Sequence, residues 1–310
     1  MRFAIYGAGG LGGYYGARLA AAGHEVGFVA RGAHLAAMRE GGLRVVSPKG
    51  DLHLAAPRAS ADPADIGPVD VVLVAVKTWQ IPEVARAMGP LLAPDTVVVP
   101  FLNGVEAPDE LAAVVGAERV LGGLSKIFSL VDAPGVIRHI NPSDYLAFGE
   151  LAGGGSARVE ALRAVLADAG LEVEVLDAVR EALWRKLLMV TSWSALGALA
   201  RSPMGVMRGQ PETRALIERS MAEGIAVAAA QGFAIDLRYR AELWAFYDAL
   251  PAEATSSMMR DLWAGKPSEL EAWNGAIVRF GERAGVATPV HALAYHLLLP
   301  MERRARGLLD

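Results

Sequence analysis

The first half of the chain alternates short apolar runs with stretches in which apolar residues recur at helical spacing. This alternation is typical of βαβ units and predicts a parallel sheet covered by helices. The run Val69–Val76 is almost continuously apolar, as a strand buried on both faces of a sheet should be. The predicted strands are Arg2–Tyr6, Glu25–Ala30, Val69–Val76, Thr96–Phe101 and Val120–Leu124.

Smaller elements complete this half of the chain. Residues 43–46 and 51–54 flank the turn sequence Ser-Pro-Lys-Gly and predict a short hairpin. A helix at 157–169 and a strand at 172–176 are expected to close the first domain.

From residue 177 onward, helical periodicity replaces the strand pattern. The predicted helices are 178–200, 211–231, 240–250, 266–284 and 289–302. Prolines stand at expected helix starts and glycines follow expected helix ends, namely Pro211, Pro267, Pro289, Gly232, Gly285 and Gly307. The sequence therefore predicts an α/β domain at residues 1–177 and an all-α domain at residues 178–310.

Composition narrows the function classes. Hydrophobic residues make up 53% of the chain, which is ample for two cores, and a net charge of −4 argues against a nucleic-acid-binding face. The absence of cysteine excludes disulfides and thiolate chemistry. The longest apolar stretch, residues 187–200, contains Thr and Ser and falls short of the ~20 residues of a membrane span. We expect a soluble, cytoplasmic protein without a signal peptide.

A glycine-rich loop follows the first predicted strand and opens a helix. Its sequence, Gly-Ala-Gly-Gly-Leu-Gly, has the spacing of a dinucleotide-binding loop in a Rossmann-type domain. In that role Gly7 permits the tight turn, Gly9 lets the backbone approach the diphosphate, and Gly12 allows the helix to pack closely on the strand. The alternative is a glycine-rich turn without a ligand. The predicted cofactor contacts in this loop are Gly7, Ala8, Gly9, Gly10, Leu11 and Gly12.

The end of the second predicted strand indicates which dinucleotide binds. A site for NAD usually carries an acidic residue here, about 20 residues past the loop, to accept from the ribose hydroxyls. This chain has Arg31, whose guanidinium suits the 2′-phosphate of NADPH. The alternative is a surface arginine after a strand. We predict NADPH as the cofactor.

Two further strands are followed by polar residues at the edge where ligands bind in open α/β sheets. Lys77 follows Val69–Val76 and is expected to contact the cofactor or an anionic substrate. Asn103 follows Thr96–Phe101 and is expected to hydrogen-bond the nicotinamide region or the substrate. The alternatives are a solvated lysine and a turn asparagine in the left-handed conformation.

The helical half holds two candidate ionisable residues. Lys186 lies within an otherwise apolar helix, where a lysine is costly unless it is paired or functional. Glu269 is expected in the first turn of helix 266–284, where the helix dipole alone would favour a carboxylate. His291 and His296 lack convincing metal-ligand spacing, so no metal site is predicted. His34 is interpreted as a loop or strand-end histidine.

The order of these elements resembles the ketopantoate reductase (2-dehydropantoate 2-reductase) family over nearly the whole chain. The segments that carry the resemblance are Gly7–Gly12, Val29–Gly32, Val76–Gln80, Leu102–Gly104, Trp184–Leu187, Thr255–Asp261 with Glu269, and Asn274-Gly275. The resemblance implies an N-terminal Rossmann domain, a helical C-terminal domain and NADPH in the cleft between them. It also implies reduction of 2-dehydropantoate to pantoate in pantothenate biosynthesis.

The resemblance further implies roles for single residues. Lys186 is similar to the family's general acid, and Glu269 to the acid that binds a substrate hydroxyl and helps to place that lysine. Asn103 matches an active-site asparagine, Ser257 a serine near the substrate carboxylate, and Arg31 the contact to the 2′-phosphate.

One departure from the family's pattern concerns the substrate. Members active on ketopantoate typically carry asparagines four and eight residues after the lysine, where this chain has Val190 and Ser194. These spacings place all three residues on one helical face, so the change falls on the wall of the substrate pocket. Ser194 is retained as a predicted substrate contact. Because valine cannot hydrogen-bond a substrate hydroxyl, a paralogue acting on a more apolar 2-oxo acid is an alternative.

Three functions remain open from the sequence. The first is NADPH-dependent reduction of a small 2-oxo acid. The second is a decarboxylating β-hydroxyacid dehydrogenase of the 6-phosphogluconate type, which also uses a lysine on a helix after a Rossmann domain. The third is a non-catalytic NADP-binding sensor, and its only support in the sequence is the presence of Val190 and Ser194. The helical half could support a homodimer.

Overall fold

The chain folds as two units in the computed structural model, which describes residues 1–309. The α/β unit comprises Met1–Leu102 and Glu106–Arg180. The helical unit comprises Asn103–Val105 and the residues from Glu181 onward. The predicted fold class, a Rossmann-type α/β domain with a parallel sheet followed by an all-α domain, is confirmed. The predicted domain boundary at residue 177 stays a prediction.

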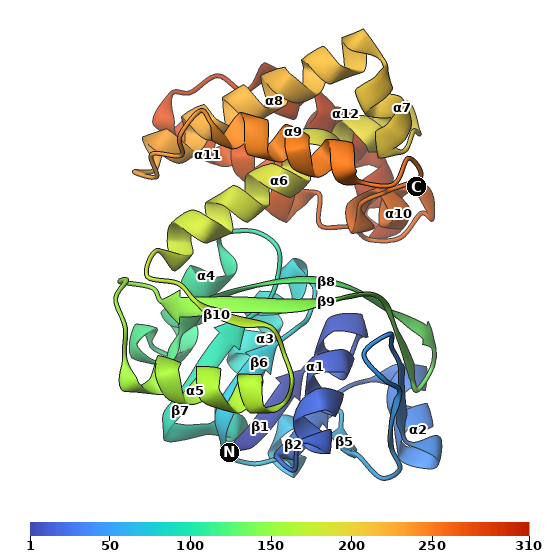
Figure 1. Ribbon diagram of the computed structural model, residues 1–310, viewed down its shortest axis with the longest axis vertical. Helices are drawn as coiled ribbons and strands as arrows, with labels where there is room; N and C mark the ends of the chain where they lie inside the picture. Colours follow the sequence, from blue (N-terminus) through green and yellow to red (C-terminus); the bar gives the residue numbers. More distant parts are fainter. Residues whose placement is uncertain (310) are drawn as a thin grey trace. The chain divides into compact units, whose positions relative to one another are not determined.

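A five-stranded parallel sheet forms the centre of the α/β unit (Figure 1). Its strand order is β5-β2-β1-β6-β7, so the chain begins in the middle strand and reaches the two edges in turn. The strands are β1 (Arg2–Tyr6), β2 (Glu25–Val29), β5 (Arg58–Ser60), β6 (Val69–Val74) and β7 (Leu92–Pro100). The nearly unbroken apolar run of β6 is buried on both faces, as its sequence predicts.

A second, mixed sheet lies in the same unit, and the sequence pattern does not predict it as a sheet. Its order is β10-β9-β3-β4, with β8 paired to β9. The strands are β3 (Leu43–Val46), β4 (Leu52–Leu54), β8 (Leu121–Ala133), β9 (Val136–Glu150) and β10 (Val173–Val175). The predicted hairpin is confirmed, because β3 and β4 pair antiparallel. The β8 and β9 strands run side by side as a long antiparallel hairpin (Figure 1).

The predicted parallel strand Val120–Leu124 is wrong in its placement. It forms the start of β8 in the mixed sheet, and a single bridge between Val98 and Val120 links it to the parallel sheet. The outer part of β8 alternates exposed and half-buried residues. That part therefore lacks the continuous apolar run by which the parallel strands are recognised.

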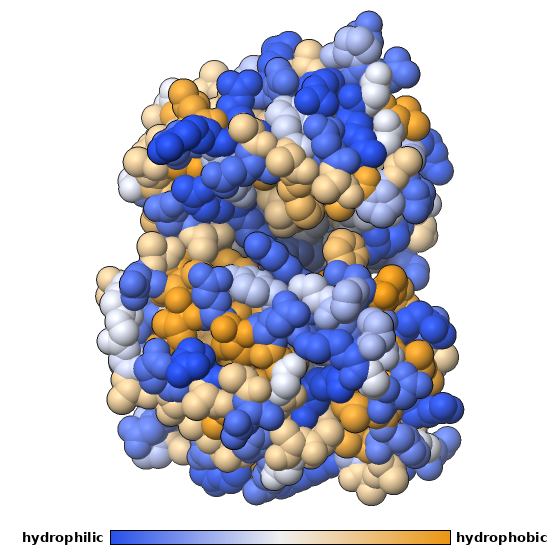
Figure 2. Space-filling view, in the orientation of Figure 1, coloured by the Kyte–Doolittle hydropathy of each residue, from blue (hydrophilic) through white to orange (hydrophobic). Residues whose placement is uncertain are grey.

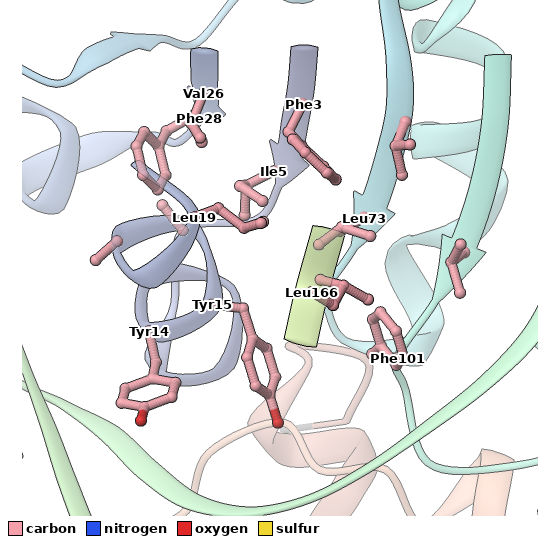
Figure 3. Close-up of a cluster of buried hydrophobic side chains, with 14 of the residues drawn as sticks. Phe3, Ile5, Tyr14, Tyr15, Leu19, Val26, Phe28, Leu73, Phe101 and Leu166 are labelled. Atoms are coloured by element: carbon pink, nitrogen blue, oxygen red, sulfur yellow. The ribbon is translucent and has the colours of Figure 1, made fainter. Parts of the chain in front are cut away.

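Five helices accompany the sheets of the α/β unit, and they are α1 (Gly10–Ala21), α2 (Gly32–Gly41), α3 (Ile81–Ala87), α4 (Ala107–Val115) and α5 (Ala157–Asp168). Buried side chains of β1, α1 and α5 form one core, where Phe3, Tyr15 and Leu166 meet (Figure 3). A second core on the other face of the sheet joins Val72 of β6 to Ile81 of α3. Burial on both faces is what requires helices on both sides of the sheet.

The hydroxyl groups of Tyr14 and Tyr15 point out of the first core and hydrogen-bond Asp144 of the mixed sheet. Figure 3 shows both rings with their oxygens turned away from the apolar cluster around Ile5. The Tyr14 hydroxyl donates to the Asp144 carboxylate at 2.8 Å, and Lys49 Nζ donates to the other oxygen at 2.8 Å. Asp144 is fully buried, so these donors offset its loss of water. Burial and the bond to Asp144 raise the pKa of Tyr14 to about 12.

The helical unit is built around α6 (Val179–Ala200). The other helices are α7 (Met204–Gly209), α8 (Pro211–Ala230), α9 (Tyr239–Ala249), α10 (Ser257–Trp263), a π-helical turn (Glu271–Gly275), α11 (Ala276–Ala284) and α12 (Pro289–Ala305). Figure 2 shows polar and charged side chains over the visible face of each unit, with apolar side chains in patches between them. None of the helices in residues 1–309 has both the length and the apolar composition of a membrane span.

Side chains from neighbouring segments hydrogen-bond the backbone carbonyls of α6. The Tyr239 hydroxyl donates to the Arg185 carbonyl at 2.6 Å, and the Tyr247 hydroxyl donates to the Met189 carbonyl at 2.7 Å. Trp263 Nε1 donates to a further α6 carbonyl, that of Ala198, at 3.1 Å. The apolar bodies of these large residues can therefore be buried while their polar tips stay satisfied.

The predicted helix 266–284 is wrong at its start. The π-helical turn begins at Glu271 and α11 at Ala276, so Pro267 is not a helix-start residue here and Glu269 precedes the helix. The reason is a contact distant in sequence: the carboxylate of Glu302 on α12 accepts from the Ser268 backbone N–H at 3.0 Å and holds this segment as a turn. By contrast, Pro211 and Pro289 begin their helices as expected.

We expect Gly12→Ala to lower the free energy of unfolding by about 1–3 kcal/mol, because the new methyl would overlap the Gly7 carbonyl and the Ile5 side chain. Gly9→Ala is the matched control. Apart from Gly9 and the residues next to it in the chain, no heavy atom of residues 1–309 lies within 4 Å of its Cβ position, and its cost at a helix N-cap should stay below about 1 kcal/mol. Urea denaturation of both variants measures the difference, and equal losses would contradict the packing role of Gly12.

Candidate functional site

The glycine loop between β1 and α1 is shaped by packing on one side and left open on the other. Gly7 has a φ of 100°, and a Cβ there would stand 2.8 Å from the Ala75 carbonyl oxygen. Gly9 faces open space, because no heavy atom of residues 1–309 outside Gly9 and its two chain neighbours lies within 4 Å of its Cβ position. Gly9 is also the N-cap of α1 and offers no side chain to the first N–H groups of that helix. An exposed helix N-terminus beside a side-chain-free backbone fits a phosphate group.

Gly10 is constrained by the β8–β9 hairpin. A Cβ at this position would stand 2.6 Å from the Ser129 carbonyl oxygen and 2.8 Å from Leu130 Cα. The hairpin backbone therefore crosses directly over the first residue of α1. The sequence predicts Gly10 as a cofactor contact, and the structure adds a packing reason for a glycine at this position.

Arg31 stands at the end of the second strand, as predicted, and is the N-cap of α2. Its side chain is exposed, and the first turn of α2 contains no acidic residue. An exposed guanidinium beside the N-terminus of a ten-residue helix fits a phosphate better than a pair of ribose hydroxyls. The predicted contact of Arg31 with the 2′-phosphate of NADPH stays a prediction.

Lys77 and Asn103 follow β6 and β7 as predicted. The end of β6 packs against the glycine loop, since Gly7 lies on Ala75 and Val76, and Lys77 is the next residue. Asn103 does not adopt the left-handed conformation of a turn asparagine, because the left-handed residue of that turn is Gly104, with a φ of 106°. Asn103–Val105 groups with the helical unit, where Gly104 lies near Ala272 of the π-helical turn.

Lys186 lies on the buried side of α6 and is only 9% exposed. The next two residues of the helix, Leu187 and Leu188, are fully buried. Lys186 has an interaction partner in the protein. The carbonyls on either side of it along the chain, those of Arg185 and Met189, accept the two tyrosine hydroxyls, which fixes the backbone that carries the lysine.

Glu269 is 6% exposed and also has a partner in the protein. The residue before it is anchored to α12: Ser268 donates its backbone N–H to both oxygens of Glu302, at 3.1 and 3.0 Å. Arg306 completes this contact, because its Nε donates to Glu302 at 2.6 Å. The buried carboxylate of Glu302 therefore holds the chain immediately before Glu269.

The π-helical turn after Glu269 is anchored to α6. Asn274 Nδ2 donates to the Thr191 carbonyl at 3.4 Å and to His291 Nδ1 at 2.9 Å. His291 Nε2 then donates to the Ser220 carbonyl at 3.0 Å, which is the tautomer that this network requires. Complete burial lowers the pKa of His291 to about 4, so the ring is neutral at pH 7. Lys186 and Glu269 thus stand on two segments joined through Asn274.

Ser257 and Ser194 lie in different environments. Ser257 is half-buried at the start of α10, and the neighbouring Ser256 provides the N-cap by accepting from Met259 N–H at 3.2 Å. Ser194 is fully buried, and its hydroxyl donates to the Val190 carbonyl within α6. The hydroxyl hydrogen of Ser194 is therefore used inside the helix.

Sequence reasoning misses the residues that support the candidate site. Glu302, Asn274 and His291 gain their roles from partners 34, 83 and 71 positions away, which no local pattern reveals. In the structure, this region is marked by the π-helical turn, a feature often found at functional sites. In residues 1–309 no three His, Asp or Glu side chains gather in a way that could hold a metal ion.

Comparison with known proteins covers both units. The family model described as "Ketopantoate reductase PanE/ApbA" matches residues 3–153. The model described as "Ketopantoate reductase PanE/ApbA C terminal" matches residues 178–302. The two matches follow one another along the chain in the order that their descriptions imply.

Individual relatives are similar over almost their full length. A 2-dehydropantoate 2-reductase of Mesorhizobium japonicum is 32% identical, covering 93% of this chain and 94% of its own. The uncharacterized oxidoreductase YkpB of Bacillus subtilis is 29% identical over 95% of this chain and 97% of its own. The crystal structure of a PanE/ApbA family ketopantoate reductase from Ralstonia eutropha is 33% identical, with a TM-score of 0.91, and covers 99% of this chain and 100% of its own.

We expect the buried His291 to make the protein less stable in acid. Folding lowers its pKa from the ordinary value of 6.5 to about 4. Between pH 6.5 and pH 4 this histidine is therefore protonated in the unfolded chain and neutral in the folded protein. The free energy of unfolding should therefore fall by up to about 1.4 kcal/mol per pH unit as the pH drops from 6.5 towards 4.

Denaturation at several pH values tests this against two variants. His291→Gln cannot titrate and should show a flatter pH dependence over this range, whatever its stability at pH 7. His296→Ala removes an exposed histidine of the same helix and should keep the wild-type slope. An unchanged slope in His291→Gln would rule out the proposed titration.

Proposed function

Because the chain belongs to the ketopantoate reductase family, we propose that it is an NADPH-dependent oxidoreductase that reduces a small 2-oxo acid to the 2-hydroxy acid. The substrate is 2-dehydropantoate, giving pantoate, or a related acid. The family resemblance expected from the sequence is confirmed. The observation that carries the proposal is the burial of Lys186 on α6 in a chain of this family.

The α/β unit would hold the cofactor. The open backbone at Gly9 and the first N–H groups of α1 would receive the diphosphate, and Arg31 the 2′-phosphate. Lys77, which follows the strand packed on Gly7, would add a positive charge. When bound, the reduced nicotinamide supplies the hydride that reduces the keto carbon.

Lys186 would supply the proton. In its ammonium form it donates to the keto oxygen as negative charge develops there, so that hydride and proton together give the hydroxyl group. A charge held in apolar surroundings stabilises the developing alkoxide more strongly than the same charge in water. The tyrosine hydroxyls on the neighbouring α6 carbonyls would keep the backbone that carries Lys186 in place.

Glu269 would keep Lys186 charged and oriented, because a nearby carboxylate favours the ammonium form. Its own position is supported by Ser268 and Glu302 on one side and by Asn274 on the other. Asn103 and Ser257 would hold the substrate carboxylate or a distal hydroxyl.

The predicted wall of the substrate pocket differs from that of typical family members at Val190 and Ser194. Val190 offers no hydrogen bond, and the Ser194 hydroxyl donates to the Val190 carbonyl. Because neither of these two positions offers a free hydrogen-bond donor, this part of the wall favours a 2-oxo acid with an apolar side chain over one with a hydroxyl. This supports a related acid as the substrate beside 2-dehydropantoate itself.

NADPH consumption with a panel of 2-oxo acids, 2-dehydropantoate among them, tests the proposal. We expect Lys186→Met to lower turnover by about 10²- to 10⁴-fold while NADPH binding stays near wild type, because the variant fills the same space without a proton to donate. Lys266→Ala, which removes an exposed lysine of the same unit, should behave as wild type.

Each other outcome has a clear meaning. Full turnover by Lys186→Met would remove the lysine from the mechanism. Release of carbon dioxide in the oxidative direction would identify a decarboxylating dehydrogenase. NADPH binding without reduction of any acid in the panel would identify a sensor that has lost catalysis.

A second variant tests the choice of cofactor. Arg31→Ala should raise the KM for NADPH by about 10- to 100-fold and leave the KM for NADH nearly unchanged, since only NADPH carries the 2′-phosphate. Arg44→Ala, an exposed arginine on β3, serves as the charge control. Equal effects of Arg31→Ala on both cofactors would contradict the assigned contact.

A further inference from the structure

The β8–β9 hairpin orients a histidine that the sequence alone presents as a loop residue. His34 is the third residue of α2, and Gly135 in the turn between β8 and β9 donates its backbone N–H to His34 Nδ1 at 3.1 Å. Because Nδ1 accepts this bond, the proton of the neutral ring is carried by Nε2. The hairpin therefore presents His34 as a donor through Nε2.

That donor is buried and unsatisfied. Burial lowers the pKa of His34, and the nearby Ala8 carbonyl in the glycine loop opposes this shift. A lowered pKa keeps the ring neutral at pH 7. The effect of the Ala8 carbonyl shows that the ring lies close to the glycine loop. Within residues 1–309, however, no acceptor, Ala8 included, has the geometry of a hydrogen bond to Nε2. A buried donor without a partner is costly in a folded protein and calls for an explanation.

Two neighbours define what this donor faces. Arg31 is the N-cap of the same helix, three residues earlier, and is exposed. The hairpin that holds His34 also crosses Gly10, and there the buried hydroxyl of Ser129 likewise has no partner within residues 1–309. Both residues adjoin the glycine loop, His34 near Ala8 and Ser129 near Gly10, and this loop is the region proposed above for the phosphates of the cofactor.

We propose that His34 is a cofactor-binding residue, whose Nε2–H donates to a phosphate oxygen of the adenosine half of NADP(H). The Gly135 N–H sets the tautomer of the ring before the cofactor arrives. This inference rests on the proposed dinucleotide site. Two phosphates could be the acceptor, the 2′-phosphate and the 5′-diphosphate, and they share the same anionic oxygen chemistry.

The test is a binding titration of the full chain with 2′,5′-ADP and with ADP, which needs no turnover. His34→Ala should weaken binding by about 10- to 100-fold, the usual effect of losing a hydrogen bond to a charged group. His34→Gln keeps an N–H donor of similar reach and should recover part of the loss. His296→Ala should bind as wild type, and thermal melting of every variant monitors folding.

The pattern across the two ligands locates the acceptor. Loss for 2′,5′-ADP alone places the bond on the 2′-phosphate, and loss for both places it on the 5′-phosphate that they share. Wild-type affinity in a folded His34→Ala variant for both ligands would overturn the proposal and leave the proposed function standing. Absence of binding by the wild-type protein itself would overturn both.

A measurement on the wild-type protein covers the case in which His34→Ala does not fold. The imidazole ¹⁵N–¹H signals of the histidines, with His34 assigned from the spectrum of His34→Gln, should include a Nε2–H of His34 that moves on addition of 2′,5′-ADP or ADP. A His34 signal unchanged by saturating amounts of both ligands would refute the contact.

Discussion

Hydrogen bonds from surrounding side chains to the backbone of α6 are the constraint on which the helical unit depends. The donors are Tyr239 and Tyr247 of α9, Trp263 of α10 and Asn274 of the π-helical turn, and each donates to a carbonyl of this one helix. The helix is thereby held by directional bonds as well as by apolar packing. Lys186 inherits this rigidity, because a residue on a fixed helix is positioned more accurately than one on a loop.

The α/β unit positions its candidate site by the opposite means, the removal of side chains. Strand β6 presses on Gly7 and the hairpin presses on Gly10, whereas Gly9 between them faces open space. Backbone is thus exposed at one point of a loop that is otherwise tightly packed. Each unit therefore supplies a rigid element of its own, a backbone surface suited to phosphates in one and a helix carrying an ammonium group in the other.

The sequence predicts what depends on local pattern and misses what depends on distant partners. The buried run of β6 and the proline at the start of α8 are predictable because their signals lie within a few residues. Periodicity places the start of helix 266–284 too early because Glu302, on another helix, holds Ser268 in a turn. The interpretation of His34 as a loop or strand-end residue is wrong because the residue lies in α2, and its Nδ1 accepts from Gly135 on the distant hairpin.

The crossing of the hairpin over Gly10 couples two segments that are separated by more than a hundred residues. The Ser129 carbonyl oxygen stands where any larger side chain at position 10 would begin. A nucleotide-binding loop is commonly regarded as a module that can be exchanged between enzymes. Here the shape of the loop depends on its packing against the hairpin, so a graft of this loop onto another scaffold must include β8 and β9.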